Sequence, residues 1–268
     1  MGFILKDPTN VEIIKAIENN RFEFYKNSYK AYGVLEENNA PDFICYFTGS
    51  KSAILNGAIY TEINEIKEEK IDEMISFFEK RNSPFIWHAG SKTIPDSVRD
   101  LLIKRDFQVQ SQPGMAINLN KILNKNNSIP DFEIVKIRNS KHVKLAAEIF
   151  CTANDLSIDI VIDFLKMGVK SLESDNYLGF LNGKAVATSG VAYASGVAGI
   201  YFVSTLEEAR RRGIGSTTSF KPLFDAKMKG YHWAILHSSE MGYEMYKKMG
   251  FKHYSYINQC VWIPKMMD

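Results

Sequence analysis

The segment with the clearest chemical potential is short, basic and rich in glycine: Arg210-Arg211-Arg212-Gly213-Ile214-Gly215-Ser216. It follows a strand-like run that ends near Thr205 and precedes a helical pattern that places Phe220 and Leu223 inward. Glycine lets a backbone turn tightly and approach a ligand closely. The first turn of a helix presents unbonded N–H groups and the positive end of the helix dipole. Together with three arginines, this arrangement predicts a phosphate-binding site.

The spacing of this segment excludes two common phosphate-binding loops. A P-loop needs Gly-x-x-x-x-Gly-Lys followed by Ser or Thr, and the segment lacks this pattern. A dinucleotide fingerprint needs a third glycine three residues after the second, where this chain has Thr218. The pattern that remains is Arg-x-x-Gly-x-Gly, formed by Arg210, Gly213 and Gly215. The alternative interpretation is a solvated basic turn at the end of a strand.

A second motif, Tyr246-Lys247-Lys248-Met249-Gly250-Phe251, follows one strand and one helix start further along the chain. Gly250 suits the C-terminal cap of a helix, and the two lysines favour its negative end. With both motifs in this order, the chain resembles the GCN5-related N-acetyltransferase (GNAT) superfamily. The resemblance covers residues 132–263, and the first half resembles a degenerate member of the superfamily that lacks the phosphate loop.

The resemblance implies where acetyl-CoA would bind. In the family the glycine-containing loop wraps the pyrophosphate of this cosubstrate, which assigns that role to Arg210, Arg211, Arg212, Gly213, Ile214, Gly215 and Ser216. The pantetheine arm lies like an added strand in a slot between residues 198–203 and 233–237, where it would bond backbone groups near Tyr201, Phe202 and Val203. Ser239 stands where many relatives have asparagine and is a further expected contact. The family reaction needs no metal.

The resemblance also implies the chemistry, in which an amine attacks the thioester directly and the thiolate of coenzyme A leaves. Tyr246 is the candidate general acid, because a phenol can donate a hydrogen bond to the sulfur as charge develops. An aromatic side chain packed in the core is the alternative interpretation. An amine with a pKa of about 10 arrives protonated, so a base or a water path is needed. The sequence leaves that base open among Glu148, Asp155, Glu173, His237 and Glu240.

Two functions follow as hypotheses from different classes. The first is an N-acetyltransferase that moves an acetyl group from acetyl-CoA to a primary amine of a small molecule or peptide. The second is a non-catalytic acyl-CoA-binding sensor or regulatory module. The acceptor stays unidentified, although apolar walls are expected from Phe150, Phe164 and Met167. Nucleic-acid binding through the three arginines is disfavoured, because the chain does not interleave basic and aromatic residues.

Composition sets the broad class. The chain has 268 residues, with 33 Lys and Arg against 31 Asp and Glu, and a net charge of +2. This balance gives no general attraction to nucleic acid or to an anionic membrane. The sequence has no run of about 18 apolar residues, and its first residues do not resemble a signal peptide. Three scattered cysteines favour a reducing cytoplasm over a disulfide framework or a zinc site. We expect a cytoplasmic monomer or homodimer.

The first half predicts a mixed α/β domain over residues 1–128. Apolar spacing predicts helices over residues 10–30, 65–81 and from Pro95 to about 106. Strands are expected over residues 42–47, 53–63, 85–88 and 107–119, the last broken near Pro113-Gly114. The segment 120–131 is rich in asparagine and is the best linker candidate.

The second half predicts a domain over residues 132–268, so the fold class is α/β with a mixed sheet. Strands are expected over residues 132–137, 177–181, 185–193, 198–203, 233–237, 251–256 and 260–263. Helices are expected over residues 141–153, 159–167, 215–229 and 239–249. Asn182-Gly183 predicts a tight hairpin turn. Pro222 predicts a kinked helix or a late helix start. A weak echo between Phe85–His88 and Ala234–His237 suggests two related halves.

Overall fold

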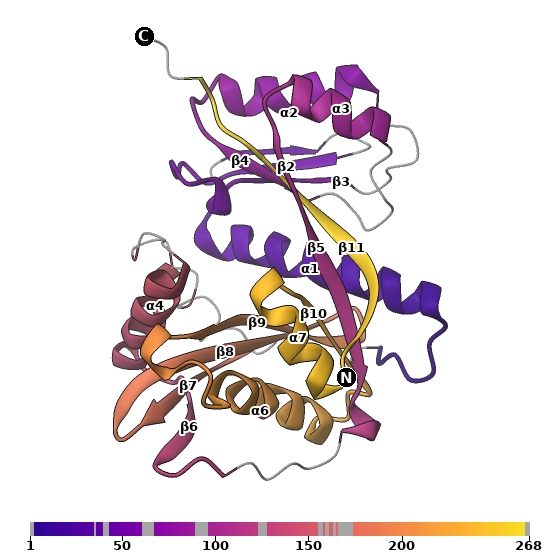
Figure 1. The fold of residues 1–268 in the computed structure, drawn as a ribbon. Coiled ribbons are helices and arrows are strands. Elements are labelled where there is room, and N and C mark those ends of the chain that lie inside the picture. Colours follow the sequence, from indigo (N-terminus) through magenta and orange to yellow (C-terminus); the bar gives the residue numbers. More distant parts are fainter. Residues whose placement is uncertain are drawn as a thin grey trace. The chain divides into compact units, whose positions relative to one another are not determined.

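The computed structural model describes residues 3–34, 36–39, 43–60, 67–88, 96–122, 128–154, 158, 161–162, 165 and 174–265. The chain divides into two units. One unit contains Met1–Asn20 and Met115–Tyr254, and the other contains Arg21–Gly114 and Ser255–Asp268. Three long elements contribute residues to both units: helix α1 (Asn10–Tyr32) and strands β5 (Gln108–Asn118) and β11 (Lys252–Trp262) (Figure 1).

The first unit is built on strands in the order β5-β10-β9-β8-β7-β6. Their bounds are β6 (Phe132–Lys136), β7 (Ser174–Leu181), β8 (Lys184–Ala194), β9 (Val197–Thr205) and β10 (Trp233–His237). Strands β6 to β9 pair antiparallel, whereas β9 and β10 pair parallel. The hairpin at Asn182-Gly183 is confirmed, because both residues have the positive φ of a type I′ turn, 50° and 75°.

Helices cover both faces of this sheet: α4 (Ser140–Asn154), α6 (Ile214–Met228) and α7 (Glu240–Met249). Neighbouring residues of a strand point to opposite faces. Tyr177 of β7 accordingly packs in one core with Leu223 of α6 and Tyr246 of α7. Leu178, the next residue, packs in a second core with residues of α4. The helix α6 therefore lies on the face opposite α4 (Figure 1).

The second unit has strands in the order β1-β2-β3-β4-β11. These are β1 (Glu36–Asn39), β2 (Phe43–Phe47), β3 (Gly57–Tyr60), β4 (Phe85–His88) and the end of β11, with a 3₁₀ turn η1 (Ala53–Leu55) before β3. The helices are α2 (Glu68–Glu79) and α3 (Asp96–Lys104). Strands β3 and β4 pair parallel, as β9 and β10 do in the first unit. The amphipathic pattern of α2 is confirmed, since Ile71, Met74 and Phe78 are buried.

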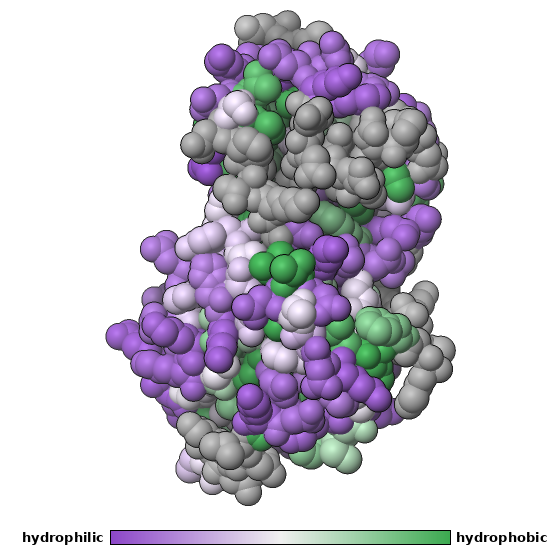
Figure 2. Space-filling model, turned by 90° about the vertical axis from the view of Figure 1, so that its right-hand side faces the viewer, coloured by the Kyte–Doolittle hydropathy of each residue, from purple (hydrophilic) through white to green (hydrophobic). Residues whose placement is uncertain are grey.

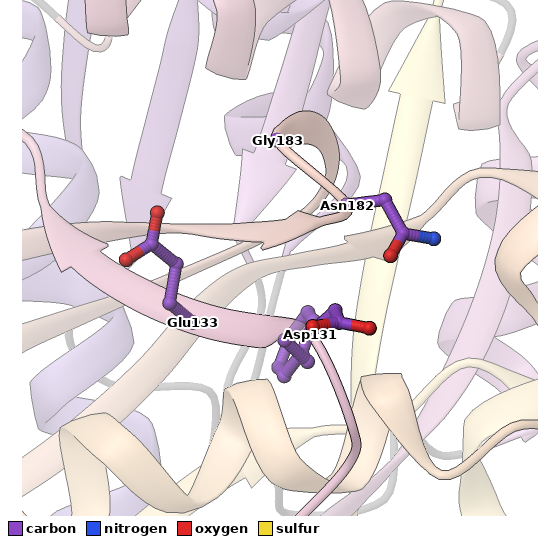
Figure 3. Close-up of a pocket in the computed structure, with 5 residues that line it drawn as sticks. Asp131, Glu133, Asn182 and Gly183 are labelled. Atoms are coloured by element: carbon purple, nitrogen blue, oxygen red, sulfur yellow. The ribbon is translucent and has the colours of Figure 1, made fainter.

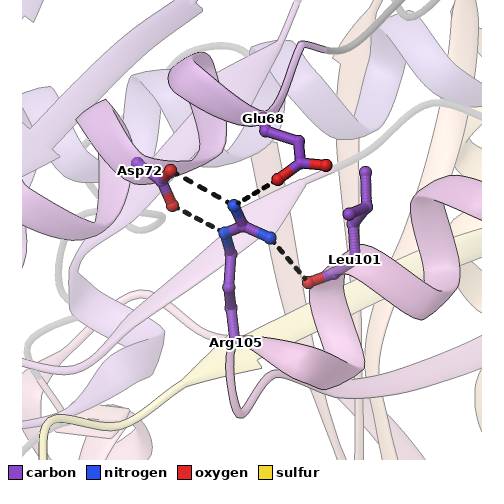
Figure 4. A network of polar contacts seen from close by, with 4 residues as sticks. All are labelled: Glu68, Asp72, Leu101 and Arg105. Carbon is purple, nitrogen blue, oxygen red and sulfur yellow. Dashed lines mark hydrogen bonds and ion pairs between the residues drawn. The ribbon is translucent and has the colours of Figure 1, made fainter.

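An arginine joins the two helices of the second unit (Figure 4). Arg105 Nε donates to Asp72 Oδ1 at 2.6 Å, and its Nη2 donates to Glu68 Oε2 at 3.0 Å. The hydrogen bonds from Arg105 hold the pKa of Asp72 below its usual value. Both carboxylates are exposed to water, so these two ion pairs contribute little to stability. Their main effect is to orient α2 against α3.

Pro222 lies inside α6, and the structure shows how its missing N–H is compensated. In a regular helix the N–H of residue 222 would bond the carbonyl of Thr218. Here the buried hydroxyl of Ser189, on β8, donates to Thr218 O at 3.0 Å. The helix begins at Ile214, so the expected late start is wrong. A hydrogen bond from a neighbouring strand explains why the proline is tolerated.

Several boundaries differ from the sequence expectation. Strand β11 runs continuously from Lys252 to Trp262 where two strands were expected, and β5 continues through Pro113-Gly114. The short strand β1 was not expected. Pairing with neighbouring strands overrides these local tendencies. Most of the helix expected over residues 159–167 lies outside the described residues, and Val161, Ile162 and Leu165, which are described, are helical. Part of the linker segment 120–131 also lies outside the described residues.

The described surface is mainly polar. Figure 2 shows hydrophilic residues over most of the visible described part, with small separate apolar areas between them. Large exposed apolar side chains include Phe224, Met228 and Met241. Within the described residues, no helix has both the length and the apolar character needed to cross a membrane.

Candidate functional site

The glycine-containing loop forms an uncapped helix start in the first unit. The cap residue of α6 is Gly213, whose φ of 79° is a left-handed conformation that favours glycine. No side chain caps the helix. Its first backbone bond runs from Thr217 N to Gly213 O at 3.0 Å, so the N–H groups of Ile214, Gly215 and Ser216 have no acceptor within the helix. These groups can bind an anion.

Nearby hydroxyl groups do not occupy these donors. Ser216 Oγ donates to Gly213 O at 2.9 Å. Thr218 and Ser219 donate in the same way to the carbonyls of Ile214 and Gly215, each at 2.8 Å. The three side chains therefore satisfy carbonyl groups one turn back. The backbone N–H groups of the first turn stay available for a ligand.

The three arginines of the loop differ in their surroundings. Arg210 is half-buried, and its Nε donates to Thr205 O at 3.1 Å, which ties the loop to the end of β9. Arg211 and Arg212 are exposed. Arg211 has a φ of 59°, so the loop contains two left-handed residues before α6. The predicted cradle thus has one arginine used in holding the backbone and two extended into solvent.

Strand β9 contains a bulge beside the cradle. Gly190 of β8 faces Tyr201, whereas Thr188 faces Ser204, so Ser189 alone is opposite Phe202 and Val203. Phe202 has a φ of 52°. On its other side β9 pairs with β10 only from Ala198 to Ile200. Ile200 is the last residue of β9 in the register with β10, and the bulge follows directly after it.

The bulge also sends its side chains to different cores. Phe202 packs against Phe150 of α4 in an edge-to-face arrangement, with ring centroids 5.1 Å apart. Val203 packs in the core shared by α6 and α7. Anchored on both faces, the strand keeps a fixed conformation at this edge. Tyr201, Phe202 and Val203 are each half-buried.

Sequence reasoning missed Asn20, which fixes β9 just before the bulge. The fully buried Asn20 amide accepts a hydrogen bond from the Tyr201 hydroxyl at 2.8 Å and donates to Ala194 O at 2.9 Å. A Cβ at Gly199 would overlap Asn20 Oδ1, so this close approach needs glycine. The signal in the sequence was weak: Asn20 continues the buried stripe of α1, where Ile13 and Ile17 precede it.

Tyr246 lies in the core between α6 and α7. Burial raises the pKa of its phenol to about 12, and a hydrogen bond with Ser219 opposes part of that rise. Ser219 also donates its hydroxyl to Gly215 O at 2.8 Å. The ring packs edge-to-face on Phe251 at 5.6 Å. A polar chain thus links Tyr246 to the first turn of the helix that carries the cradle.

The remaining candidates are more dispersed. Ser239 is the N-cap of α7, and its Oγ accepts from Gly242 N at 3.2 Å. His237 ends β10, with its ring 6.3 Å from that of Tyr201. Glu148 and Glu240 are exposed. Four residues considered in the sequence analysis lie outside the described residues: Asp155, Phe164, Met167 and Glu173.

A shallow depression of about 360 Å³ lies elsewhere in the first unit, at the hairpin between β7 and β8 (Figure 3). Asp131, Phe132, Glu133, Asn182 and Gly183 line it. None of these was predicted as a site residue. Its two carboxylates would repel an anionic cosubstrate.

Comparison with known proteins is informative for the fold. No protein-family model and no curated protein matches the chain in sequence. Among solved structures, a GCN5-related N-acetyltransferase from Kribbella flavida has 14% identity and a TM-score of 0.65, with 92% of this chain and 96% of that chain covered. A functionally unknown conserved protein from Staphylococcus epidermidis has 13% identity and a TM-score of 0.67, with 87% of this chain and 95% of that chain covered.

A tandem GNAT protein from the clavulanic acid biosynthesis pathway matches over 99% of both chains, with 8% identity and a TM-score of 0.61. The likeness therefore extends over most of the chain, whereas the sequence predicted the full resemblance for residues 132–263 and a degenerate form of it for the first half. At these identities the comparison shows the fold alone. It agrees with the mixed α/β fold described above. This chain has the fold of the GCN5-related N-acetyltransferases.

Proposed function

We propose that this protein is an N-acetyltransferase that uses acetyl-CoA to acetylate a primary amine of a small molecule or peptide. The observation that carries the proposal is the bulge of β9, which follows the segment paired with β10 and is joined by a short loop to the uncapped start of α6. A strand edge can bond an extended pantetheine arm, and a helix start can bond a pyrophosphate. One continuous segment of this chain offers both.

The residues present fit such a cosubstrate. The N–H groups of Ile214, Gly215 and Ser216 would bond the pyrophosphate, with Arg211 and Arg212 adding charge. Backbone groups from Tyr201 to Val203 would hold the pantetheine arm. Acetyl-CoA supplies the activated acyl group as a thioester. A backbone N–H at the bulge would polarise the thioester carbonyl.

Tyr246 is proposed to donate a hydrogen bond to the sulfur of the leaving group. With a pKa of about 12, the phenol stays protonated at neutral pH. A free thiol has a pKa of about 8.5, so complete proton transfer from this phenol would be uphill by about 5 kcal/mol. Hydrogen bonding as negative charge develops does not require that transfer. We assign no residue as the base that deprotonates the amine.

The proposal is tested by two measurements on the full chain. Isothermal titration with acetyl-CoA measures binding, and a thiol reagent measures release of coenzyme A in the presence of an amine panel. We expect saturable binding and amine-dependent thiol release. Failure to bind acetyl-CoA contradicts the proposal. Binding without thiol release for every amine favours the alternative, a non-catalytic acyl-CoA-binding module.

A further inference from the structure

The second unit contains a buried arginine with an unusual set of partners. Arg21, on α1, is 2% exposed. A guanidinium has five N–H groups. Within the described residues, Nη2 makes one long hydrogen bond, to Gln259 Oε1 at 3.4 Å, and Nε has no acceptor. Among the residues that the structure describes, the charge of Arg21 is therefore met by a neutral amide and an aromatic ring.

Other arginines of the same unit show the usual arrangement. Arg81 pairs with Glu36, and Arg105 pairs with Asp72 and Glu68, although both arginine side chains are more exposed than Arg21. Burying a charge without a partner is more costly than leaving it in water. The arginine with the greatest need for a carboxylate thus has none among the described residues. This contrast suggests that the carboxylate belongs to a ligand.

The contacts of Arg21 among the described residues are a neutral amide and an aromatic ring. Its guanidinium lies 5.6 Å from the centre of the Tyr25 ring, one helical turn away. Tyr25 stacks on His88 at 4.0 Å, and His88 Nε2 lies 2.8 Å from the Tyr29 hydroxyl. Gln259 of β11 faces His88 of β4 in the strand register. The Tyr25 ring and the Gln259 amide thus both lie next to the Arg21 guanidinium.

The local field is positive. Burial raises the pKa of the Cys260 thiol to about 12, and the charges of Arg21 and Arg99 both oppose this rise. Two cations therefore act on the same buried position. The described groups that shift this pKa include no carboxylate. Arg99 is exposed, so water screens its charge, and Arg21 supplies the buried positive charge.

We propose that Arg21 and Gln259 form a binding site for a small monocarboxylate in the second unit, with Tyr25 as its aromatic wall. The guanidinium fork matches the two oxygens of a carboxylate, and the Gln259 amide can accept from Arg21 while its NH₂ donates to the ligand. A single buried arginine balances one negative charge, which favours a carboxylate over a phosphate dianion. The inference goes beyond the proposed acetyl transfer, because all three residues lie outside the unit that holds the cradle.

Thermal unfolding of the full chain tests this site, with sodium acetate, sodium glutamate and sodium phosphate as probes against sodium chloride of equal ionic strength. We expect acetate or glutamate to raise the Tm in a saturable way, as a ligand of the native state does. Arg21→Met should abolish this response and still fold, because it replaces an uncompensated buried charge with an apolar side chain. Arg105→Met is the matched control and should keep the full response.

Gln259→Leu provides a second variant that keeps the charge, and it should weaken the carboxylate affinity about tenfold or more. Three results would overturn the site: no carboxylate response in the wild type, an equal response to phosphate, or an unchanged response in Gln259→Leu. Loss of folding in Arg21→Met together with no wild-type response would show that Arg21 pairs with a carboxylate of the chain itself. Titration of Gln259→Leu with acetyl-CoA separates the carboxylate site from the proposed function. We expect this variant to bind acetyl-CoA as the wild type does, even where its carboxylate response is lost.

Discussion

The hydroxyl of Tyr201 donates a hydrogen bond of 2.8 Å to the side chain of Asn20, a residue 181 positions earlier in the chain. The same amide bonds the carbonyl of Ala194 in the hairpin between β8 and β9. Tyr201 immediately precedes the bulge residue Phe202. One buried amide in α1 therefore fixes the strand on which the proposed pantetheine edge depends.

Asn20→Ala is predicted to destabilise the protein and to disturb this edge. The substitution leaves the Tyr201 hydroxyl and the Ala194 carbonyl without their partner, and unmet buried groups cost about 1–3 kcal/mol each. We expect the free energy of unfolding in urea to fall by about 3 kcal/mol. Tyr201→Phe, which removes one hydroxyl and leaves Asn20 its other partners, should cost about 1 kcal/mol. Equal losses for the two variants would show that Asn20 acts through Tyr201 alone.

A second prediction concerns the hydroxyl that compensates Pro222. Ser189→Ala removes the donor to Thr218 O and should lower the free energy of unfolding by about 1–3 kcal/mol. In a Pro222→Ala background, the restored N–H of residue 222 can bond Thr218 O, so the same change should cost less than about 1 kcal/mol. A double-mutant cycle measures this coupling. Additive effects would mean that Ser189 does not replace the missing backbone donor.

These two contacts show where sequence reasoning stops. The helix α6, the strands β8 to β10 and the hairpin at Asn182-Gly183 followed from local patterns, because apolar spacing and turn residues act over a few positions. The partners of Asn20 and of Thr218 lie on other elements and have no local signature. The bulge at Phe202 also depends on the register between β8 and β9, which the sequence does not display.

The division of the chain shows the same limit. Local pattern located β5 and the final strand region, but their lengths and their contribution to two units depend on pairing between distant segments. The loop at Gly213 could be predicted from the sequence, because the residues that form it are consecutive. The sequence placed the loop directly before a helix, and the structure has it there without a side-chain cap. Arg210 as a ligand contact stays a prediction, and the structure shows that its Nε donates to Thr205 O.

A third prediction tests the cradle with two matched glycines. Gly213 and Gly183 have similar positive φ values, 79° and 75°, and an added Cβ would meet nothing closer than 3.8 Å at either position. Alanine at each should therefore cost a similar amount of stability, about 1 kcal/mol, from backbone strain. Only Gly213→Ala should also weaken acetyl-CoA binding in isothermal titration, by about tenfold. Equal binding by the two variants would contradict a role of the α6 start in holding the pyrophosphate.

A fourth prediction concerns Tyr246→Phe, which keeps the ring packing on Phe251 and removes the hydroxyl. If the phenol assists the leaving thiolate, turnover should fall by about 100-fold or more while acetyl-CoA binding persists. Unchanged turnover would exclude Tyr246 from the reaction. Because its pKa is about 12, ionisation of Tyr246 should not reduce wild-type turnover below about pH 10.

The same substitution has a pH signature in stability. The pKa of Tyr246 is raised in the folded protein to about 12, against about 10 in the unfolded chain. Its contribution is therefore fully present below pH 10 and is lost as the pH rises toward 12. From below pH 10 to above pH 12 the free energy of unfolding of the wild type should fall by about 3 kcal/mol more than that of Tyr246→Phe. Groups that titrate in both proteins contribute equally to the two values and drop out of the comparison. Urea unfolding of both proteins at pH 9 and pH 11 should show about half of this difference, about 1.4 kcal/mol. Parallel pH dependences would show that the phenol is not held in a desolvated site.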